Sequence, residues 1–305
     1  MSDEVRSRLR IGTAPDSWGV WFADDPRQLP WQQFLDEAAE SGYQWIELGP
    51  YGYLPTDPSQ LRDELGQRGL SLSGGAVPAG LHRGQAGLDE AIAACRAEAE
   101  LLTALGASHL VLLPEQYTDV AGNLTQPAEL DADQWRSLLA GADELAAILD
   151  AEFGVALTFH PHADSHVETQ DQVERFLEGT DPGRVLLCLD TGHISYRGGD
   201  NLAIISKFGQ RMGYVHLKQV DPAVIARVDA ERLPFPQAVR LGAMVEPPLG
   251  EPPMEPLLAA LGELDADLFA IVEQDLFPCR PDVPLPIATR TLTYYASCGL
   301  GPARR

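Results

Sequence analysis

Short apolar segments alternate with longer amphipathic segments along the whole chain, and this alternation constrains the fold more than any other feature. Alternating strands and helices are typical of βαβ units, which build a parallel sheet. Eight segments have the length and composition of buried strands, and each is followed by a helix-compatible segment; they are residues 10–15, 43–50, 70–77, 109–115, 154–162, 185–193, 213–220 and 268–276. Eight such repeats predict an α/β fold, a closed (β/α)₈ TIM barrel.

Length and composition fit one such barrel over residues 1–305, since 45% hydrophobic residues are ample for a large core. A doubly wound open sheet would need a glycine-rich phosphate turn after its first strand, and "GTAPDSWG" contains no G-x-G-x-x-G motif. Two extended loops are predicted after strands four and seven, at residues 114–131 and 231–253. The second is apolar and rich in proline, which favours an ordered flap over the barrel mouth or an oligomer contact.

Local signals support the helices between these strands. Residues 31–42 carry apolar residues at helical spacing and end at Gly42, and Thr169 with Gln172 forms a capping-box pattern. The longest predicted helix, residues 87–106, is strongly amphipathic.

The formal charge of −23 restricts the partners of the chain, because the basic residues are scattered and form no cationic face for nucleic acid or an anionic membrane. No apolar run approaches the roughly 20 residues of a membrane span, and the first ten residues lack the apolar core of a signal peptide. A cytoplasmic location is expected. The four cysteines are far apart and are expected to be reduced, with Cys188 in a core strand.

Polar side chains gather at the ends of the last four predicted strands. In a (β/α)₈ barrel the carboxyl ends of all strands meet at one mouth, so residues distant in sequence can converge there. The residues concerned are His160 and His162 on strand five, Asp190 and His193 on strand six, His216 on strand seven, and Glu273 and Asp275 on strand eight. A strand-end Asp can merely cap the next helix, and a lone His can be structural. Four converging strand ends favour a site for one divalent cation, with Mn²⁺ the first candidate beside Mg²⁺, Co²⁺ and Zn²⁺.

Further residues extend this predicted site. His160 and His162 fall on one side of an extended strand, as do His216 and Lys218. Lys218 could hold a substrate oxygen or stabilise an enolate. Glu168 precedes a helix cap and could complete a carboxylate-rich metal shell.

The first two strands contribute aromatic and acidic residues, namely Trp18, Glu47 and Tyr51. Aromatic rings beside carboxylates suit a sugar or cyclitol, whose C–H faces stack while its hydroxyls form hydrogen bonds. Trp18 could equally serve as packing at the barrel end. His193 and Asp275 are the other candidate substrate-binding residues.

With these motifs in place, the chain resembles the xylose-isomerase-like TIM-barrel family of sugar phosphate isomerases and epimerases, and within it the inosose dehydratase branch. The resemblance covers nearly the whole chain and rests on "DTGH" (190–193), "VHLK" (215–218), "IVEQD" (271–275) and "HPHADSHVE" (160–168), in the family's order. It implies one divalent metal held by Asp190, His216, Glu273 and a carboxylate from the strand-five region.

The chain departs from the family pattern at two positions. Keto-sugar epimerases of this family typically end strand five with a glutamate that acts as ligand and base, whereas this strand ends in His160. Glu168 is the predicted replacement ligand, because similar dehydratase-like sequences also carry a Glu after their histidine cluster. Gln219 stands where the family commonly has Asp after "HLK".

These features predict a metal-dependent enzyme that acts on a keto-polyol or keto-sugar through a metal-stabilised enolate, most closely an inosose (2-keto-myo-inositol) dehydratase. His160, His162, Lys218 and Glu273 are the predicted catalytic residues. Alternatives are a keto-sugar isomerase or epimerase, a lyase acting on an oxidised glycoside, and a metal-containing sugar-binding protein or subunit without turnover. A metal-dependent nuclease is disfavoured by the negative charge. Loop apolarity suggests a homo-oligomer.

Overall fold

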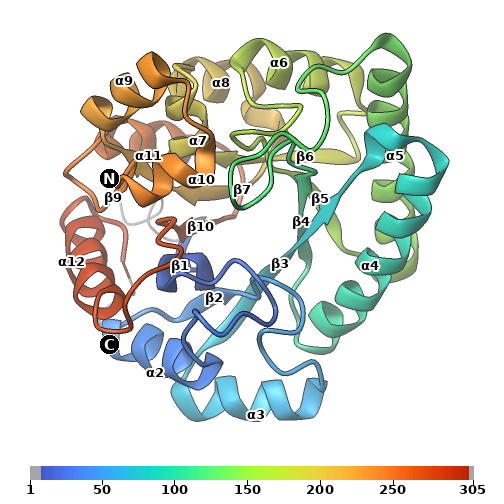
Figure 1. Ribbon diagram of the computed structural model, residues 1–305. Coiled ribbons are helices and arrows are strands. Elements are labelled where there is room, and N and C mark those ends of the chain that lie inside the picture. The colour runs from blue at the N-terminus through green and yellow to red at the C-terminus, as the bar shows by residue number, and fades with distance from the viewer. Residues whose placement is uncertain (1–7, 302–305) are drawn as a thin grey trace.

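Eight parallel strands close into a barrel in the computed structural model, which describes residues 8–301 (Figure 1). The strands follow one another around the barrel in the order β1-β10-β7-β6-β5-β4-β3-β2. Their bounds are β1 Leu9–Thr13, β2 Trp45–Glu47, β3 Ser71–Ala79, β4 His109–Pro114, β5 Ala156–Phe159, β6 Val185–Asp190, β7 Met212–Leu217 and β10 Leu268–Val272. Each predicted strand is present, and the predicted (β/α)₈ barrel is confirmed. The prediction that residues 1–305 form one domain extends past the described residues and stays a prediction.

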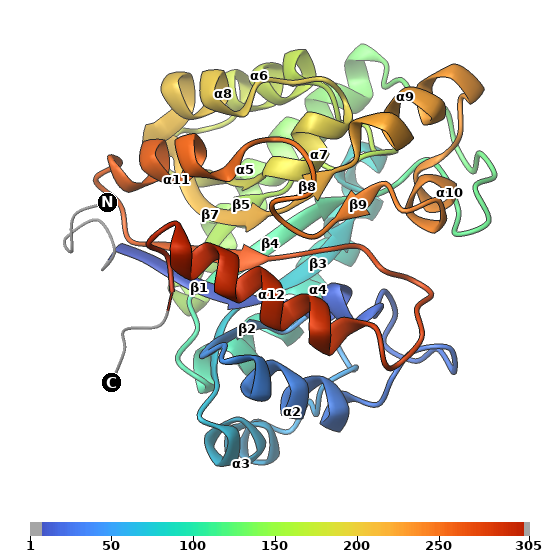
Figure 2. The same cartoon turned by 90° about the vertical axis from the view of Figure 1, so that its left-hand side faces the viewer.

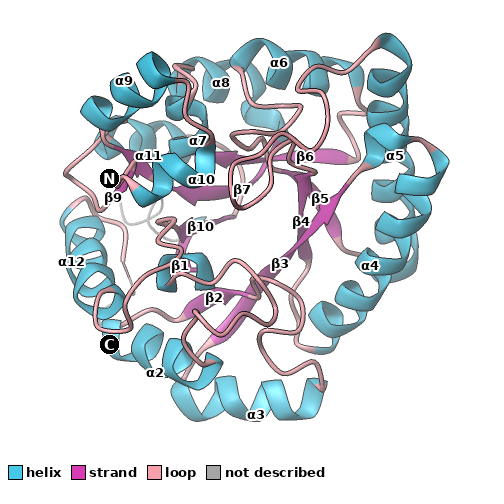
Figure 3. Ribbon diagram, in the orientation of Figure 1, coloured by secondary structure: helices cyan, strands magenta, loops and turns pink. Residues whose placement is uncertain are grey.

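A ring of helices surrounds the strands (Figure 3). The helices are α2 Trp31–Ser41, α3 Pro58–Arg68, α4 Gln85–Ala104, α5 Ala132–Phe153, α6 Gln170–Gly179, α7 Thr191–Tyr196, α8 Asn201–Phe208, α9 Pro222–Glu231, α10 Phe235–Arg240, α11 Met254–Gly262 and α12 Pro284–Ser297. Short 3₁₀ helices cover Pro15–Trp18, Leu81–Arg83 and Gly209–Arg211. The predicted helix signals are confirmed: α2 ends at Gly42, whose φ is 99°, and Thr169 caps α6 in a capping box with Gln172.

Each strand divides its side chains between two cores because successive residues point to opposite faces. In β6, Leu187 and Leu189 pack in the large core that the strands share with the helices. Cys188, between them, packs inside the barrel with strand residues such as Tyr214 and Ile271. This alternation determines which residues at the strand ends point into the mouth.

Most of the predicted strands end earlier than expected, and three of these ends bear on the site. The segment after β5 leaves the sheet at His160, β6 gives way at Thr191 to the short helix α7, and β7 ends at Leu217. Asp190 ends β6 because its side chain accepts hydrogen bonds from the backbone nitrogens of Gly192 and His193, which starts the helix.

The two predicted extended loops lie at the same end of the barrel. Residues 115–131 connect β4 to α5, and the connection from β7 to β10 contains α9, α10, α11 and a small antiparallel pair of strands, β8 Gln219–Val220 with β9 Met244–Val245. In the side view of Figure 2, α9, α10 and loop 115–131 lie at one end of the barrel, and the start of β1 lies at the other. Residues 231–253 are therefore an ordered part of the barrel mouth.

Within residues 8–301, no helix combines the length and the apolarity needed to cross a membrane. All four cysteines are free thiols, and Cys188 is buried in β6 as predicted.

Candidate active site

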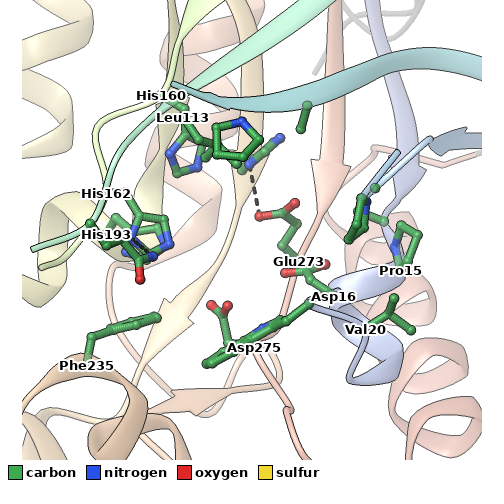
Figure 4. Close-up of a pocket in the computed structure, with 18 of the residues that line it drawn as sticks. Pro15, Asp16, Val20, Leu113, His160, His162, His193, Phe235, Glu273 and Asp275 are labelled. Carbon is green, nitrogen blue, oxygen red and sulfur yellow. Dashed lines mark hydrogen bonds and ion pairs between the residues drawn. The ribbon is translucent and has the colours of Figure 1, made fainter. Parts of the chain in front are cut away.

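A cavity of about 490 Å³ opens at the carboxyl ends of the strands. Polar residues at or just beyond the ends of β5, β6, β7 and β10 line it, together with apolar residues from the loops after β1, β4 and β7. Figure 4 shows His160, His162, His193, Glu273, Asp275 and Asp16 around this space, with Phe235 at its edge.

Four of the side chains at the strand ends could hold a metal ion. His160, Asp190, His216 and Glu273 each offer one ligand atom, and these atoms all lie within 4.8 Å of one another. They converge because His216 has the same parity in β7 as the interior residue Tyr214, and Glu273 the same parity in β10 as Ile271. Two imidazoles and two carboxylates are a suitable donor set for a divalent cation.

Asp190 divides its two oxygens between helix capping and this cluster. Its Oδ1 accepts hydrogen bonds of 2.8 Å from the backbone nitrogens of Gly192 and His193. Its Oδ2 is buried without a hydrogen-bond partner and lies 3.4 Å from Nε2 of His160 and 3.8 Å from Nδ1 of His216. This buried oxygen faces two imidazole nitrogens and the Lys218 ammonium, which is 3.1 Å away, and it is suited to bind a cation among them.

His216 is held between two carboxylates. Its Nε2 lies 3.0 Å from Oε2 of Glu47, and its Nδ1 lies 2.9 Å from Oε2 of Glu273. A carboxylate on Nε2 fixes the ring and leaves Nδ1 for the cluster, which is a common support for a metal-binding histidine. Glu47 therefore touches the cluster through His216 while also lining the cavity.

Lys218 neutralises much of the negative charge in the site. Its Nζ lies 2.8 Å from Asp275, 3.1 Å from Asp190, 3.1 Å from Glu273 and 3.9 Å from Asp16, and its side chain is 2% exposed. Burial by itself lowers the pKa of this amine, but the surrounding carboxylates outweigh it and raise the pKa well above its usual range. Lys218 is thus a protonated donor at the cavity wall.

Burial and neighbouring charges also set the protonation states of Asp190 and His162. Burial raises the pKa of the Asp190 carboxyl, but Lys218 and His193 outweigh this effect and hold the pKa well below its usual range. Burial, His160 and Lys218 together lower the pKa of His162 to about 3. Asp190 is therefore ionised, and His162 is a neutral imidazole.

The neutral ring of His162 has a defined orientation. Its Nδ1 lies 2.6 Å from the carbonyl oxygen of Ala163, so this nitrogen carries the proton and Nε2 is an acceptor. The rings of His162 and His193 lie close together, with centroids 3.9 Å apart and planes tilted by 38°. His162 is therefore suited to accept a hydrogen from a ligand hydroxyl rather than to donate a proton.

Glu168 is not brought to the cluster, which corrects the prediction that it is a metal ligand. Its Oε1 accepts a hydrogen bond from Tyr117, and its Oε2 accepts bonds from the backbone of Asp164 and from the Arg197 guanidinium. His160 occupies the strand-five position of the cluster instead. The loop after β5 turns this side chain toward Tyr117 and toward Arg197, which follows α7.

We expect the substitution Glu168→Gln to leave metal affinity within about twofold of the wild type, far below the 10–100-fold typical of residues that support metal ligands. Isothermal titration of the metal-free protein with Mn²⁺ measures this affinity. The matched change His160→Gln should weaken binding strongly, and a weak effect of His160→Gln with a strong effect of Glu168→Gln would restore Glu168 as the ligand.

Two predicted substrate-binding residues lie outside the cavity. Trp18 is fully buried, packs edge-on against Phe34 and donates from Nε1 to Glu37 on α2. Tyr51 is 41% exposed and does not line the cavity. The chain turns at the 3₁₀ helix Pro15–Trp18, which directs Trp18 toward α2. Apart from Asp190 and Glu168, the other predicted site residues line the cavity: His160, His162, His193, His216, Lys218, Glu47, Glu273 and Asp275.

Several residues that line the cavity were not predicted from the sequence, among them Asp16, Trp21 and Phe235. Asp16 lies three residues beyond the end of β1, so attention to polar residues near strand ends, which selected Asp190, could also have selected it. Trp21 and Phe235 lie in loops, where no periodicity indicates the direction of a side chain.

A closed (β/α)₈ barrel with imidazoles and carboxylates gathered at its carboxyl-terminal mouth defines a class of barrel proteins equipped to bind a divalent cation. Residues 35–281 match the family model described as xylose isomerase-like TIM barrel, and the chain belongs to this family.

Similar proteins include one named inosose dehydratase from Geobacillus kaustophilus, which is 33% identical over 88% of each chain. Another protein of that name, from Clostridium perfringens, is 27% identical over 94% of this chain and 97% of its own. Among solved structures, the IOLI protein with a bound zinc atom superposes with a TM-score of 0.70 at 17% identity, covering 94% of this chain and 98% of its own. D-psicose 3-epimerase from Clostridium cellulolyticum superposes with a TM-score of 0.70 at 14% identity, covering 95% and 99%. The two superpositions support the fold.

Proposed function

We propose that the protein is a divalent-metal-dependent dehydratase acting on a neutral cyclic keto-polyol, of which 2-keto-myo-inositol is the first substrate to test. The observation that carries this proposal is the cluster of His160, Asp190, His216 and Glu273 beneath a cavity of about 490 Å³. The similarity to proteins named inosose dehydratase over nearly the whole chain supports dehydration as the reaction.

The four cluster residues would hold the metal, which when bound supplies a Lewis acid that polarises the ketone of the substrate. Mn²⁺ is the first metal to test, beside Mg²⁺, Co²⁺ and Zn²⁺. His216 is oriented for this role by Glu47, and Asp190 by its helix-capping bonds.

The chain's own groups then act on the substrate. Lys218, kept protonated by its carboxylates, donates a hydrogen bond to the oxygen that gains charge when the neighbouring C–H loses its proton. Glu273 is the proposed acceptor of that proton, and Nε2 of His162 accepts a hydroxyl hydrogen to orient the ring. Lys218 can also donate to the departing β-hydroxyl, whereas His160 acts in the cluster rather than as the proton donor.

The electrostatics of the cavity favour an uncharged substrate. Among the described residues that line it, Lys218 is the one lysine or arginine, against the carboxylates of Asp16, Glu47, Glu115, Glu273 and Asp275. A phosphate group would need arginine or lysine partners or free backbone donors, and Lys218 is already occupied by carboxylates.

We therefore expect a phosphorylated cyclitol to compete poorly with its neutral parent. Inhibition constants of myo-inositol and myo-inositol 1-phosphate, measured against 2-keto-myo-inositol, should differ by about tenfold or more in favour of myo-inositol, a difference of about 1.4 kcal/mol. Tighter binding of the phosphate would contradict this assignment.

The first test incubates the Mn²⁺-loaded protein with 2-keto-myo-inositol and follows near-ultraviolet absorbance and the NMR spectrum. A dehydrated product that requires metal, and that is absent with the double variant Asp190→Ala/Glu273→Ala, is the expected result. Solvent deuterium in the substrate without loss of water would instead indicate an isomerase or epimerase. Metal binding with neither exchange nor product from any keto-polyol would favour a binding protein.

A further inference from the structure

Asp164 connects four segments of the barrel mouth, although its side chain does not line the cavity. Its Oδ1 pairs with the Arg197 guanidinium on α7 at 3.0 Å. Its Oδ2 accepts hydrogen bonds from the hydroxyl of Thr118 at 2.9 Å and from the backbone nitrogen of Phe235 at 2.7 Å. One carboxylate thus joins the loop after β5, the loop after β4, α7 and the start of α10.

The backbone of Asp164 strengthens this connection. Its carbonyl accepts a bond of 2.8 Å from the nitrogen of Tyr117, and its own nitrogen donates to Glu168 Oε2, which also binds Arg197. Asp164 has a φ of 58°, in the left-handed region that Asp and Asn tolerate better than other residues with a side chain. Its side chain is 3% exposed, so its hydrogen bonds are shielded from water.

Phe235, whose nitrogen Asp164 holds, forms one wall of the cavity. Its ring centroid lies 5.1 Å from those of His162 and His193, and its ring is nearly parallel to Trp21 at 6.3 Å. Figure 4 shows Phe235 below these two histidines, beside the space that Asp275 also faces. A ligand in the cavity would lie between the polar cluster and this aromatic wall.

We propose that Asp164 is a positioning residue for substrate binding, because it holds the Phe235 segment in place as the aromatic wall of the cavity. This inference rests on the proposed function in one respect, namely that the substrate binds in this cavity. Since Asp164 touches no cluster residue through its side chain, its loss should weaken binding of substrate while leaving the reacting groups in place. The C–H face of a cyclic polyol is the part of the substrate that would pack on Phe235.

The test compares Asp164→Ala with the conservative variant Asp164→Asn. We expect Asp164→Ala to raise KM for 2-keto-myo-inositol about tenfold with kcat within about twofold. Asp164→Asn should recover most of the KM, because an amide oxygen can still accept from the Phe235 nitrogen and Asn tolerates the same backbone conformation. Unchanged KM in Asp164→Ala, or an equal loss of kcat in both variants, would overturn the proposal.

A double-mutant cycle separates positioning from general stability. Phe235→Ala alone should raise KM to a similar extent, and the double variant Asp164→Ala/Phe235→Ala should be little worse than either single variant, because both remove the same wall. If the increases in KM of the two single variants multiply in the double variant, the proposal is contradicted. Asp221→Ala is the control, since Asp221 caps α9 in the same β7 to β10 connection through Ala223 and Val224 and should leave KM unchanged.

Hydrogen exchange without substrate tests the inference independently of turnover. Amides of residues 235–240 should exchange faster in Asp164→Ala than in the wild type, while those of β6 and β7 stay protected. If the wild type fails to turn over 2-keto-myo-inositol but this local change occurs, the proposed function fails and the positioning role stands. Equal exchange in residues 235–240 would reject the positioning role even in an active enzyme. If Asp164→Ala does not fold, Thr118→Val, which removes one bond to Asp164, takes its place in the exchange measurement.

Discussion

Asp190→Asn is expected to reduce turnover by about 10³-fold, because the Lewis acid it helps to bind contributes several kcal/mol and each 1.36 kcal/mol is worth a factor of ten. An asparagine oxygen can still accept the capping bonds from Gly192 and His193, so α7 should keep its start. The amide then replaces Oδ2, which faces His160 and His216, and it removes a negative charge from the cluster. Affinity for Mn²⁺, measured by titration calorimetry, should fall together with turnover.

Asp200→Asn provides the matched control, since Asp200 caps α8 by accepting from the backbone of Ala203 and belongs to no ligand cluster. It should leave metal affinity and turnover unchanged. Equal losses in both variants would mean that Asp190 acts through helix capping alone, and full activity of Asp190→Asn would remove Asp190 from the metal site.

Lys218→Met is expected to lower the free energy of unfolding of the metal-free protein by about 3–5 kcal/mol, the usual cost of removing one partner from a buried ion pair. The amine is the cation that faces Asp16, Asp190, Glu273 and Asp275, and its loss leaves these carboxylates to repel one another in a buried site. Urea unfolding of the metal-free variant measures this change. Turnover should also fall, because the donor to the substrate oxygen is removed.

Mn²⁺ should stabilise Lys218→Met more than it stabilises the wild type, because the cation takes over part of the compensation for the carboxylates. Lys207→Met is the control: Lys207 is 47% exposed and pairs with Glu174 and Glu178, so its loss should cost at most about 1 kcal/mol. A metal-free Lys218→Met protein as stable as Lys207→Met would show that the carboxylates of the site do not depend on Lys218.

The positions of the site residues were predictable where a strand carried them. Asp190 ends β6, His216 lies in β7 and Glu273 directly follows β10, and the alternation of side chains places them on the barrel interior. Helix capping and a place in the ligand cluster were considered as alternatives for Asp190. The structure combines them, because one oxygen caps α7 while the other faces the cluster. The prediction failed for Glu168, Trp18 and Tyr51, which follow the strand ends in turns where periodicity no longer applies.

Contacts between loop residues could not be predicted from the sequence either. Phe235 lies some 70 residues beyond Asp164 in the sequence, yet its backbone nitrogen binds that carboxylate. Nothing in either local pattern pairs them, because the bond forms only after the barrel has closed and brought the loops after β5 and β7 together.

The sequence by itself determined the eight strands, the closed parallel barrel, the end at which the site lies and the inward direction of Asp190, His216 and Glu273. These follow from hydrophobic periodicity and the alternation of strand side chains, which are local properties. The tertiary structure alone decided that His160 completes the cluster, that Lys218 lies among the carboxylates and that Asp164 holds the Phe235 wall. Those arrangements depend on loop paths and on charges from distant segments, which acquire their neighbours when the barrel closes.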